Sequence, residues 1–129
     1  MKTKNGMEMI QVAEVAYNSW QLANDQTTDF EECQDKDRWL SVAAKAMMLM
    51  DPRDDGHTIT LDVRQTAEWL YLGYAGEDSR WGALPKHDKL AWEAVVRSLA
   101  GAIMSDNPAA HSYDEIRPWM ETQLAGVSE

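Results

Sequence analysis

The amino-acid sequence predicts an all-α fold, a compact bundle of two repeated helical hairpins followed by a short C-terminal helix. Apolar residues recur at three- and four-residue steps in five segments, which is the pattern of amphipathic helices. A short motif also occurs twice, as AEVAY at Ala13–Tyr17 and AEWLY at Ala67–Tyr71. Trp39 and Trp92 follow the tyrosines of these motifs at spacings of 22 and 21 residues, and each begins a second apolar run. The two observations together favour two copies of one helix–loop–helix unit.

The copies define an internal repeat over residues 9–50 and 63–104, within a single helical domain that spans residues 1–129. One helical hairpin cannot bury its own apolar face, so two copies are expected to form a joint core. A chain of 129 residues is long enough to bury such a core without metal or disulfide cross-links. In this arrangement we expect Trp39 and Trp92 to be equivalent and largely buried.

The first hairpin is expected to begin with a helix over Met7–Ala23, where alanines, Met9 and Trp20 share one face. The polar stretch Asn24–Gln34 reads as a loop, with a turn of helix around Phe30, its only large apolar residue. Asp35 is a candidate cap for a second helix, whose apolar face runs from Trp39 to Met50. Asp51-Pro52 ends this helix, because the residue before a proline disfavours the helical region.

The third helix is predicted to start near Thr60 and to end at Gly73 and Gly76. A short strand over His57–Val63 is the alternative, since that segment alternates and is rich in β-branched residues. We prefer the helix, because a lone strand has no evident partner. Leu84-Pro85 then starts a fourth helix with proline in its first turn, where the missing donor costs nothing.

The last helix has two alternative starts. Ser112 and Glu115 have capping-box spacing, which predicts a helix that begins there. Pro118 conflicts with that start, because a proline six residues into a helix removes a hydrogen bond to the carbonyl of Asp114. Either the helix begins near Pro118 instead, or it begins at Ser112 and is kinked at Pro118.

The formal net charge is −10, from 22 acidic and 12 basic residues. Such a field disfavours sequence-independent binding to nucleic acid or to an anionic membrane, so we expect neither as a direct partner. The single cysteine, Cys33, excludes an internal disulfide and suits a reducing compartment. No apolar run approaches the roughly 18 residues of a membrane span, and the first residues lack the apolar stretch of a signal peptide. The expected location is the cytoplasm.

The negative charge is concentrated between the first two helices. Six acids fall within thirteen residues there and meet only Lys36: Asp25, Asp29, Glu31, Glu32, Asp35 and Asp37. They serve either solubility or the binding of a protein with a basic surface. Trp81 and Trp119 lie next to a glycine and a proline and are candidate apolar anchors for that partner, or lids on the core. The other tryptophans, Trp20, Trp39, Trp69 and Trp92, are expected in the core.

No metal or cofactor is expected. Residues 51–62 have the spacing of a calcium-binding EF-hand loop, with acid at positions 1, 5 and 12 and glycine at position 6. Arg53 brings a positive charge where the loop needs an oxygen ligand, and Asp62 is shorter than the usual glutamate, so we predict no calcium binding. The histidines His57, His87 and His111 lack the spacing that structural zinc favours.

No catalytic residue is assigned either. Acidic neighbours should keep the Cys33 thiol neutral, which argues against a nucleophile. No glycine-rich phosphate loop and no basic patch with interleaved aromatic residues occurs. Glu14 and Glu68 occupy matching repeat positions and could approach each other across a twofold axis, which leaves a small enzyme with paired carboxylates as one alternative. A structural or regulatory subunit that forms a homodimer through Met- and Trp-rich surface is another.

The phrase Trp81–Pro85 (WGALP), followed by Lys89–Val95 (KLAWEAV), resembles a pattern of small bacteriophage-encoded proteins in which W-x-x-L-P precedes a helix of the form W-x-x-V. The resemblance covers roughly residues 67–103. It implies a phage or mobile-element accessory protein in the host cytoplasm, and it assigns no catalytic residue. We therefore expect a non-catalytic interaction module that binds or inhibits a host protein, such as a defence or nucleic-acid-processing factor.

Overall fold

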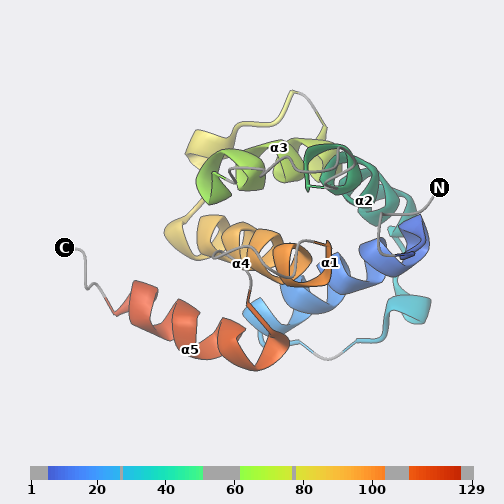
Figure 1. The fold of residues 1–129 in the computed structure, drawn as a ribbon. Helices are drawn as coiled ribbons and strands as arrows, with labels where there is room; N and C mark the ends of the chain where they lie inside the picture. The colour runs from blue at the N-terminus through green and yellow to red at the C-terminus, as the bar shows by residue number, and fades with distance from the viewer. Residues whose placement is uncertain (1–5, 27, 51–61, 77, 104–110, 126–129) are drawn as a thin grey trace, which may run out of the picture.

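The computed structural model describes residues 6–26, 28–50, 62–76, 78–103 and 111–125, and over these it is all-α, as predicted (Figure 1). The five α-helices contain more than half of the 129 residues, and two short 3-10 turns, η1 and η2, precede α2 and α4. The elements are α1 (Met9–Ala23), η1 (Phe30–Glu32), α2 (Lys36–Met50), α3 (Val63–Ala75), η2 (Trp81–Ala83), α4 (Lys86–Ile103) and α5 (Tyr113–Leu124).

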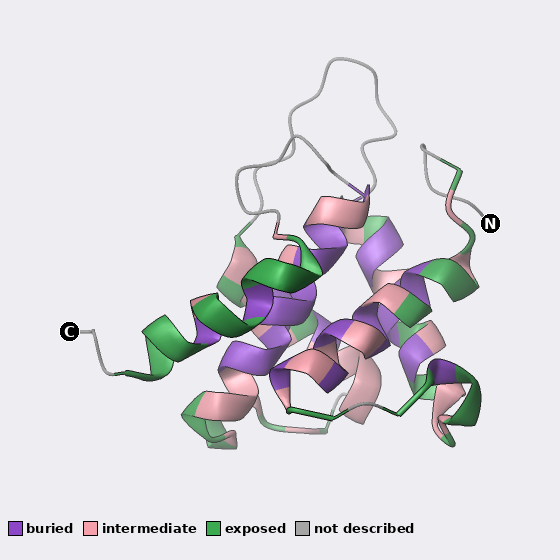
Figure 2. Ribbon diagram, turned by 90° about the horizontal axis from the view of Figure 1, so that it is seen from below, coloured by how far each residue is buried: buried purple, intermediate pink, exposed green. Residues whose placement is uncertain are grey.

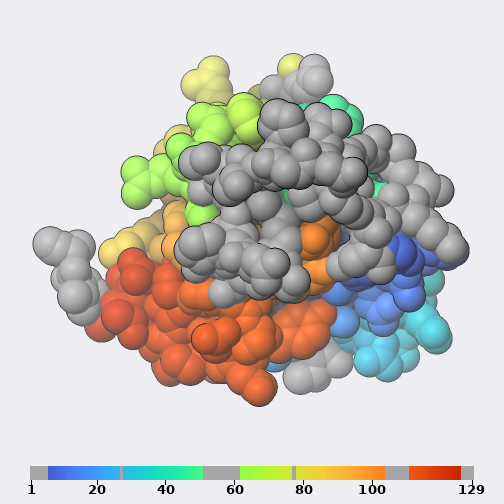
Figure 3. Space-filling model, in the orientation of Figure 1, coloured from blue at the N-terminus to red at the C-terminus, as the bar shows by residue number. Residues whose placement is uncertain are grey.

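Four of the helices close a ring around the main core. Helix α1 packs against α2 and α4, and α3 packs against the same two helices from the other side. Helix α5 lies outside this ring against α1 and α4, and it occupies the lower edge of the molecule in Figure 3. Buried positions face the interior of the ring, and the exposed positions lie on its outer surface (Figure 2). The bundle therefore buries one main core, and α5 adds a smaller cluster around Ile116 and Met120.

The centre of the core is aromatic. Trp39 of α2 and Trp92 of α4 are each only 2% exposed, which confirms their predicted burial, and their rings stack with centroids 5.7 Å apart. Trp20 contacts both rings, at 6.3 Å from Trp39 and 4.9 Å from Trp92. Tyr74 also contacts both, at 5.0 and 5.6 Å. Two aromatic residues, one from each hairpin, thus flank the same tryptophan pair.

The tyrosines of the two sequence motifs make matching contacts. Each packs against the aromatic residue of the 3-10 turn that follows it and against the tryptophan of the next helix. The pairs are Tyr17–Phe30 at 5.4 Å and Tyr17–Trp39 at 5.7 Å in the first hairpin, with Tyr71–Trp81 and Tyr71–Trp92, both at 5.9 Å, in the second. The internal repeat over residues 9–50 and 63–104 remains a prediction, and a superposition of the two hairpins is its direct test.

Trp69 is a correction to the predicted core. Its side chain is 41% exposed, because the inward face of α3 is taken by Thr66, Ala67 and Leu70. Trp20 is partly buried and packs against both hydrophobic clusters. The apolar face of α3 is therefore narrower than its sequence suggests.

Capping residues explain where two helices begin. Helix α1 starts at Met9 rather than Met7, because the Gln11 side chain accepts a hydrogen bond from the Glu8 N–H at 2.8 Å. Helix α3 starts at Val63 rather than near Thr60, because the Asp62 carboxylate accepts a hydrogen bond from the Gln65 N–H at 3.1 Å. Asp62 and Val63 thus belong to a helix start and not to a strand, and the rest of the proposed strand lies outside the described residues.

The two glycines of α3 have different roles. Gly76 ends the helix with φ of 102°, a left-handed conformation that glycine adopts without strain. Gly73 was predicted to end the helix as well, and this was wrong. It lies inside α3 beside Lys45 and the Ser41 carbonyl of α2, where an added Cβ would make only ordinary contacts.

Helix α5 begins with the predicted capping box. Ser112 stands at the N-cap position, and its backbone N–H donates to the Glu115 carboxylate at 2.8 Å. The helix then continues through Pro118, so the alternative start near Pro118 was wrong. The absence of an N–H at Pro118 leaves the Asp114 carbonyl without its usual donor inside the helix.

Candidate functional site

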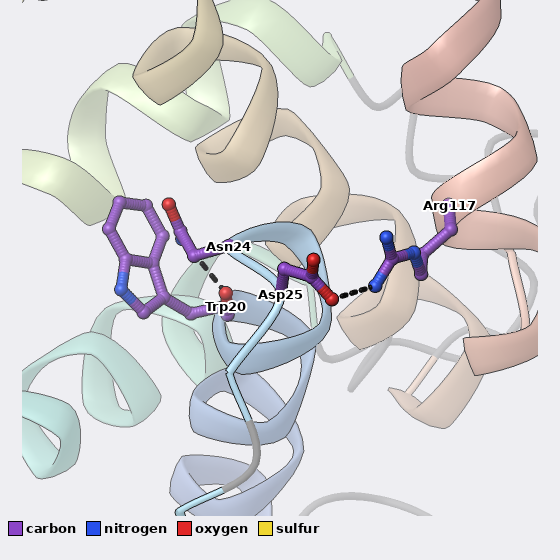
Figure 4. A network of polar contacts seen from close by, with 4 residues as sticks. All are labelled: Trp20, Asn24, Asp25 and Arg117. Atoms are coloured by element: carbon purple, nitrogen blue, oxygen red, sulfur yellow. Dashed lines mark hydrogen bonds and ion pairs between the residues drawn. The ribbon is translucent and has the colours of Figure 1, made fainter.

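The acidic segment, residues 25–37, connects α1 to α2 and is held by side chains at the end of α1. Gln21 is buried, donates to Gln26 Oε1 at 3.0 Å, and accepts from the Thr28 N–H at 2.9 Å. The Asn24 side-chain amide donates to the Trp20 carbonyl at 2.8 Å (Figure 4). These bonds fix the path of the chain where it leaves the helix.

Two residues of the acidic segment point inward. Phe30 is 6% exposed and packs edge-on against Tyr17, which confirms the predicted turn of helix around it. Asp35 accepts hydrogen bonds from Cys33 Sγ at 2.8 Å and from the Tyr74 hydroxyl. Burial acts to raise the pKa of Asp35, but these two hydrogen bonds, with a backbone hydrogen bond and the nearby Arg38, hold that pKa below its usual value. Asp35 is therefore bound within the fold, although the sequence suggests a partner-facing acid.

Asp25 is also engaged by the protein itself. It adopts a left-handed backbone conformation, with φ of 59°, directly after the end of α1. Its carboxylate forms an ion pair with Arg117 of α5 at 2.5 Å (Figure 4). The hydrogen bond from Arg117 lowers the pKa of Asp25. This pair joins the start of the acidic segment to the last helix.

The other four acids form the free negative surface. Asp29, Glu31, Glu32 and Asp37 are exposed, and no ion pair of theirs occurs within the described part of the chain. They lie around η1 and the first turn of α2. We call these four residues the acidic face. Four of the six predicted acids are thus exposed and unpaired in the described structure, whereas Asp25 is exposed but paired with Arg117 and Asp35 is bound within the fold.

The two candidate tryptophan anchors do not lie in the acidic face. Trp81 is half-buried in η2, which lies at the opposite side of the bundle from η1 (Figure 1). Trp119 is half-buried on α5, where the Arg97 guanidinium lies 4.9 Å from its ring centre and His111 packs edge-on at 6.0 Å. Both rings pack against the hydrophobic clusters, so they cover the core in addition to any contact with a partner.

One group of residues could not be read from the sequence. Arg64 of α3, Lys86 and Lys89 of α4 and Trp81 of η2 line one pocket. They are separated by up to 25 positions in the chain, and only the packing of α3 against α4 brings them together. The sequence signal that these two segments belong to one hairpin was the spacing from Tyr71 of AEWLY to Trp92, which matches that from Tyr17 to Trp39.

No metal site is found among the described residues, where no group of three His, Cys, Asp or Glu side chains could hold an ion. His87 Nδ1 lies 3.5 Å from Asp88, and His111 packs on Trp119. His57 and residues 51–61 of the EF-hand-like loop lie outside the described residues.

The residues considered as catalytic candidates, Cys33, Glu14 and Glu68, are not brought together into one site. Burial and the hydrogen bond to Asp35 raise the pKa of Cys33, so its thiol is neutral near pH 7, as expected. Glu14 is exposed on α1 close enough to Tyr113 to influence it, whereas α3, which carries Glu68, packs between α2 and α4. The packing against α2 and α4 from two sides does not juxtapose α1 and α3, the helices that carry the two carboxylates.

Within the described helices, none is long and apolar enough to span a membrane. Comparison of the chain with protein-family models, with curated proteins and with solved structures finds no match.

Proposed function

We propose that this protein is a non-catalytic interaction module whose acidic face binds a basic surface of a host protein, in the setting of a phage or mobile-element accessory protein. The observation that supports the proposal is that some residues of the acidic segment are buried or bonded within the fold, whereas others are exposed. Phe30 and Asp35 anchor the segment to the core, and the acidic face is left exposed and unpaired in the described structure.

A rigid acidic face favours binding for an energetic reason. Association costs less when the binding residues are already ordered, because less conformational entropy is lost. The contacts of Gln21 and the burial of Phe30 order the backbone that carries Asp29, Glu31 and Glu32. Charge on such a surface chiefly accelerates encounter and selects partners of opposite sign.

The experiment compares two variants with the same change in net charge. The first reverses the acidic face with Asp29→Lys, Glu31→Lys and Glu32→Lys. The control reverses three acids elsewhere, all of which are exposed: Glu14→Lys, Asp78→Lys and Glu121→Lys. Immobilised wild type and both variants are exposed to a bacterial lysate, and captured proteins are quantified by mass spectrometry.

We expect a basic protein that is captured by the wild type and by the control variant and is lost with the acidic-face variant. Its association rate, measured by surface plasmon resonance, should fall as salt rises above physiological strength. Equal loss with both variants would mean that only net charge matters. Equal retention would mean that the acidic face serves solubility, and either result would overturn the proposal.

A further inference from the structure

A pocket of about 410 Å³ lies between α3, η2, α4 and α5. Its residue Trp81 belongs to η2, which lies at the opposite side of the bundle from η1 (Figure 1). Its lining residues are Arg64, Trp81, Lys86, Lys89, Leu90, Glu93 and Gln123. Small-molecule sites commonly fall in the range of roughly 300–1,000 Å³ and combine apolar walls with a few polar groups. The pocket has that size, but its lining is mostly charged and polar, and only Trp81 and Leu90 are apolar.

The charge of this pocket is opposite to that of the chain. Three cationic side chains line it against one carboxylate, Glu93, although acids outnumber bases in the whole sequence. None of Arg64, Lys86 and Lys89 forms an ion pair within the described part of the chain. Glu93 interacts electrostatically with Arg64 and offsets one of the three positive charges, so an anion in the pocket would still be attracted by the remaining excess. The lining retains an excess of two positive charges, which matches a dianion.

The backbone adds to the same field. Lys86 and Lys89 belong to the first turn of α4, an 18-residue helix. The first N–H groups of a helix have no intrahelical acceptor, and the helix dipole places partial positive charge there. Phosphate groups bind readily at such positions. The helix start and the lysine ammonium groups therefore both favour an anion, although Asp88 in the same turn offsets part of that field.

Trp81 supplies a planar apolar surface beside these cations. It lines the pocket while its ring packs against Tyr71 at 5.9 Å, which holds the indole in place. Aromatic side chains bind planar rings by stacking, and this is tolerant of the identity of the ring. A ligand that uses both halves of the pocket has a phosphate group and a planar ring.

We propose that this pocket binds a phosphate monoester joined to a planar ring, as in a mononucleotide, with Arg64, Lys86 and Lys89 around the phosphate and Trp81 against the ring. Leu90 lies next to the lysines along α4 and contributes an apolar wall. This site is separate from the acidic face, so each can be tested without the other.

The experiment uses the full chain and four probes: AMP, adenosine, inorganic phosphate and benzoate. Binding is measured by isothermal titration calorimetry, and the indole N–H signals are followed by NMR, with the Trp81 signal assigned from Trp81→Phe. The pocket variant is Lys86→Gln with Lys89→Gln. Its control, Lys36→Gln with Lys45→Gln, removes the same charge from α2, and neither of these lysines lines the pocket.

AMP should saturate the wild type with one site and shift the Trp81 signal. Adenosine and inorganic phosphate should each bind at least about tenfold more weakly, because a stacked base or a charge-assisted hydrogen bond is worth roughly that factor. The pocket variant should bind AMP at least about tenfold more weakly than the wild type, and the control variant should bind AMP with the affinity of the wild type. Trp81→Phe keeps an aromatic ring and should retain most of the affinity, whereas Trp81→Leu should bind AMP no better than inorganic phosphate.

Three results would overturn the inference. If AMP shows no saturable binding at millimolar concentration, the proposed site does not exist. Equal weakening by the pocket and control variants would show that net charge alone controls binding. Adenosine or benzoate binding with the same affinity as AMP would show that the phosphate is not recognised. The melting temperature of every variant is also measured, because a loss of binding is informative only if the variant is folded.

Discussion

Trp39 and Trp92 stack on each other with an interplanar angle of 24°, and this contact joins α2 of the first hairpin to α4 of the second. Each ring also receives a tyrosine from its own hairpin and one flanking aromatic residue from the other. We therefore expect the stability of the ring of four helices to depend strongly on this pair.

Replacement of one tryptophan of the pair should be far more costly than replacement of an exposed tryptophan. Trp92→Ala leaves a cavity at the centre of the core and should reduce the free energy of unfolding by about 3–5 kcal/mol. Trp69→Ala, at a side chain that is 41% exposed, should cost about 1 kcal/mol or less. Urea denaturation followed by circular dichroism measures both values. Similar losses for the two variants would contradict the burial described above.

The two glycines of α3 should respond in opposite directions to alanine. Gly73→Ala should raise the free energy of unfolding by about 0.5–1 kcal/mol, because alanine is the better helix former. The added Cβ would meet the Lys45 side chain at 3.4 Å, an ordinary contact with a flexible group. Gly76→Ala should lower stability by about 1–3 kcal/mol, because its φ of 102° is strained for any residue with a Cβ. Thermal melts of both variants under one condition provide the comparison.

Tyr74→Phe tests the hydrogen bond between Tyr74 and Asp35. Removal of the hydroxyl should lower the free energy of unfolding by about 1–2 kcal/mol at pH 7, because a charged acceptor loses its donor. The pKa of Asp35 is depressed in the folded protein, so its contribution is complete above the usual value of 3.8 and is lost as pH falls through the folded pKa. The difference between wild type and variant should therefore shrink below pH 3.8.

The same variant gives a spectroscopic check. Burial and the hydrogen bond to Asp35 raise the pKa of Tyr74 to about 12. Ultraviolet titration of the wild type should show a tyrosine that ionises near this pH, and Tyr74→Phe should remove that step. Stability from this group is complete below pH 10 and falls as pH rises toward about 12. An unchanged titration curve would contradict the proposed contact.

Millimolar calcium should leave the melting temperature unchanged. Asp62 would be the last ligand of the EF-hand-like loop, yet its carboxylate caps α3 through the Gln65 N–H. Arg53 adds a positive charge at a ligand position of the same loop. A ligand that binds the native state must stabilise it, so a clear upward shift in a calcium titration would show that the loop does bind the ion.

The features that the sequence predicted are those set by local chemistry. Helical periodicity located all five helices, the Ser112–Glu115 spacing predicted the start of α5, and Phe30 marked the turn before α2. These signals act over a few residues, so they do not depend on how the helices pack. The burial of Trp39 and Trp92 was also predictable, because both lie on strong apolar stripes.

Tertiary packing decided the features that the sequence did not predict. The α3 sequence does not show that Gly73 meets α2 or that Trp69 faces outward, since both depend on which face its neighbours cover. The sequence likewise placed Asp25 and Asp35 among the acids expected to meet a partner. In the structure, Asp25 binds Arg117, 92 residues away in the chain, and Asp35 binds Tyr74, 39 residues away. Pairing at such distances is invisible to a pattern read along the sequence.

The positions of η1 and η2 have an electrical consequence. The acidic face surrounds η1, and the cationic pocket adjoins η2 at the opposite side of the bundle. Opposite charges held apart by a rigid body form a permanent dipole, and a dipole experiences a torque in the field of a charged neighbour. Near a positively charged surface this arrangement would favour an encounter through η1, whereas the net charge of −10 would still repel a negatively charged surface.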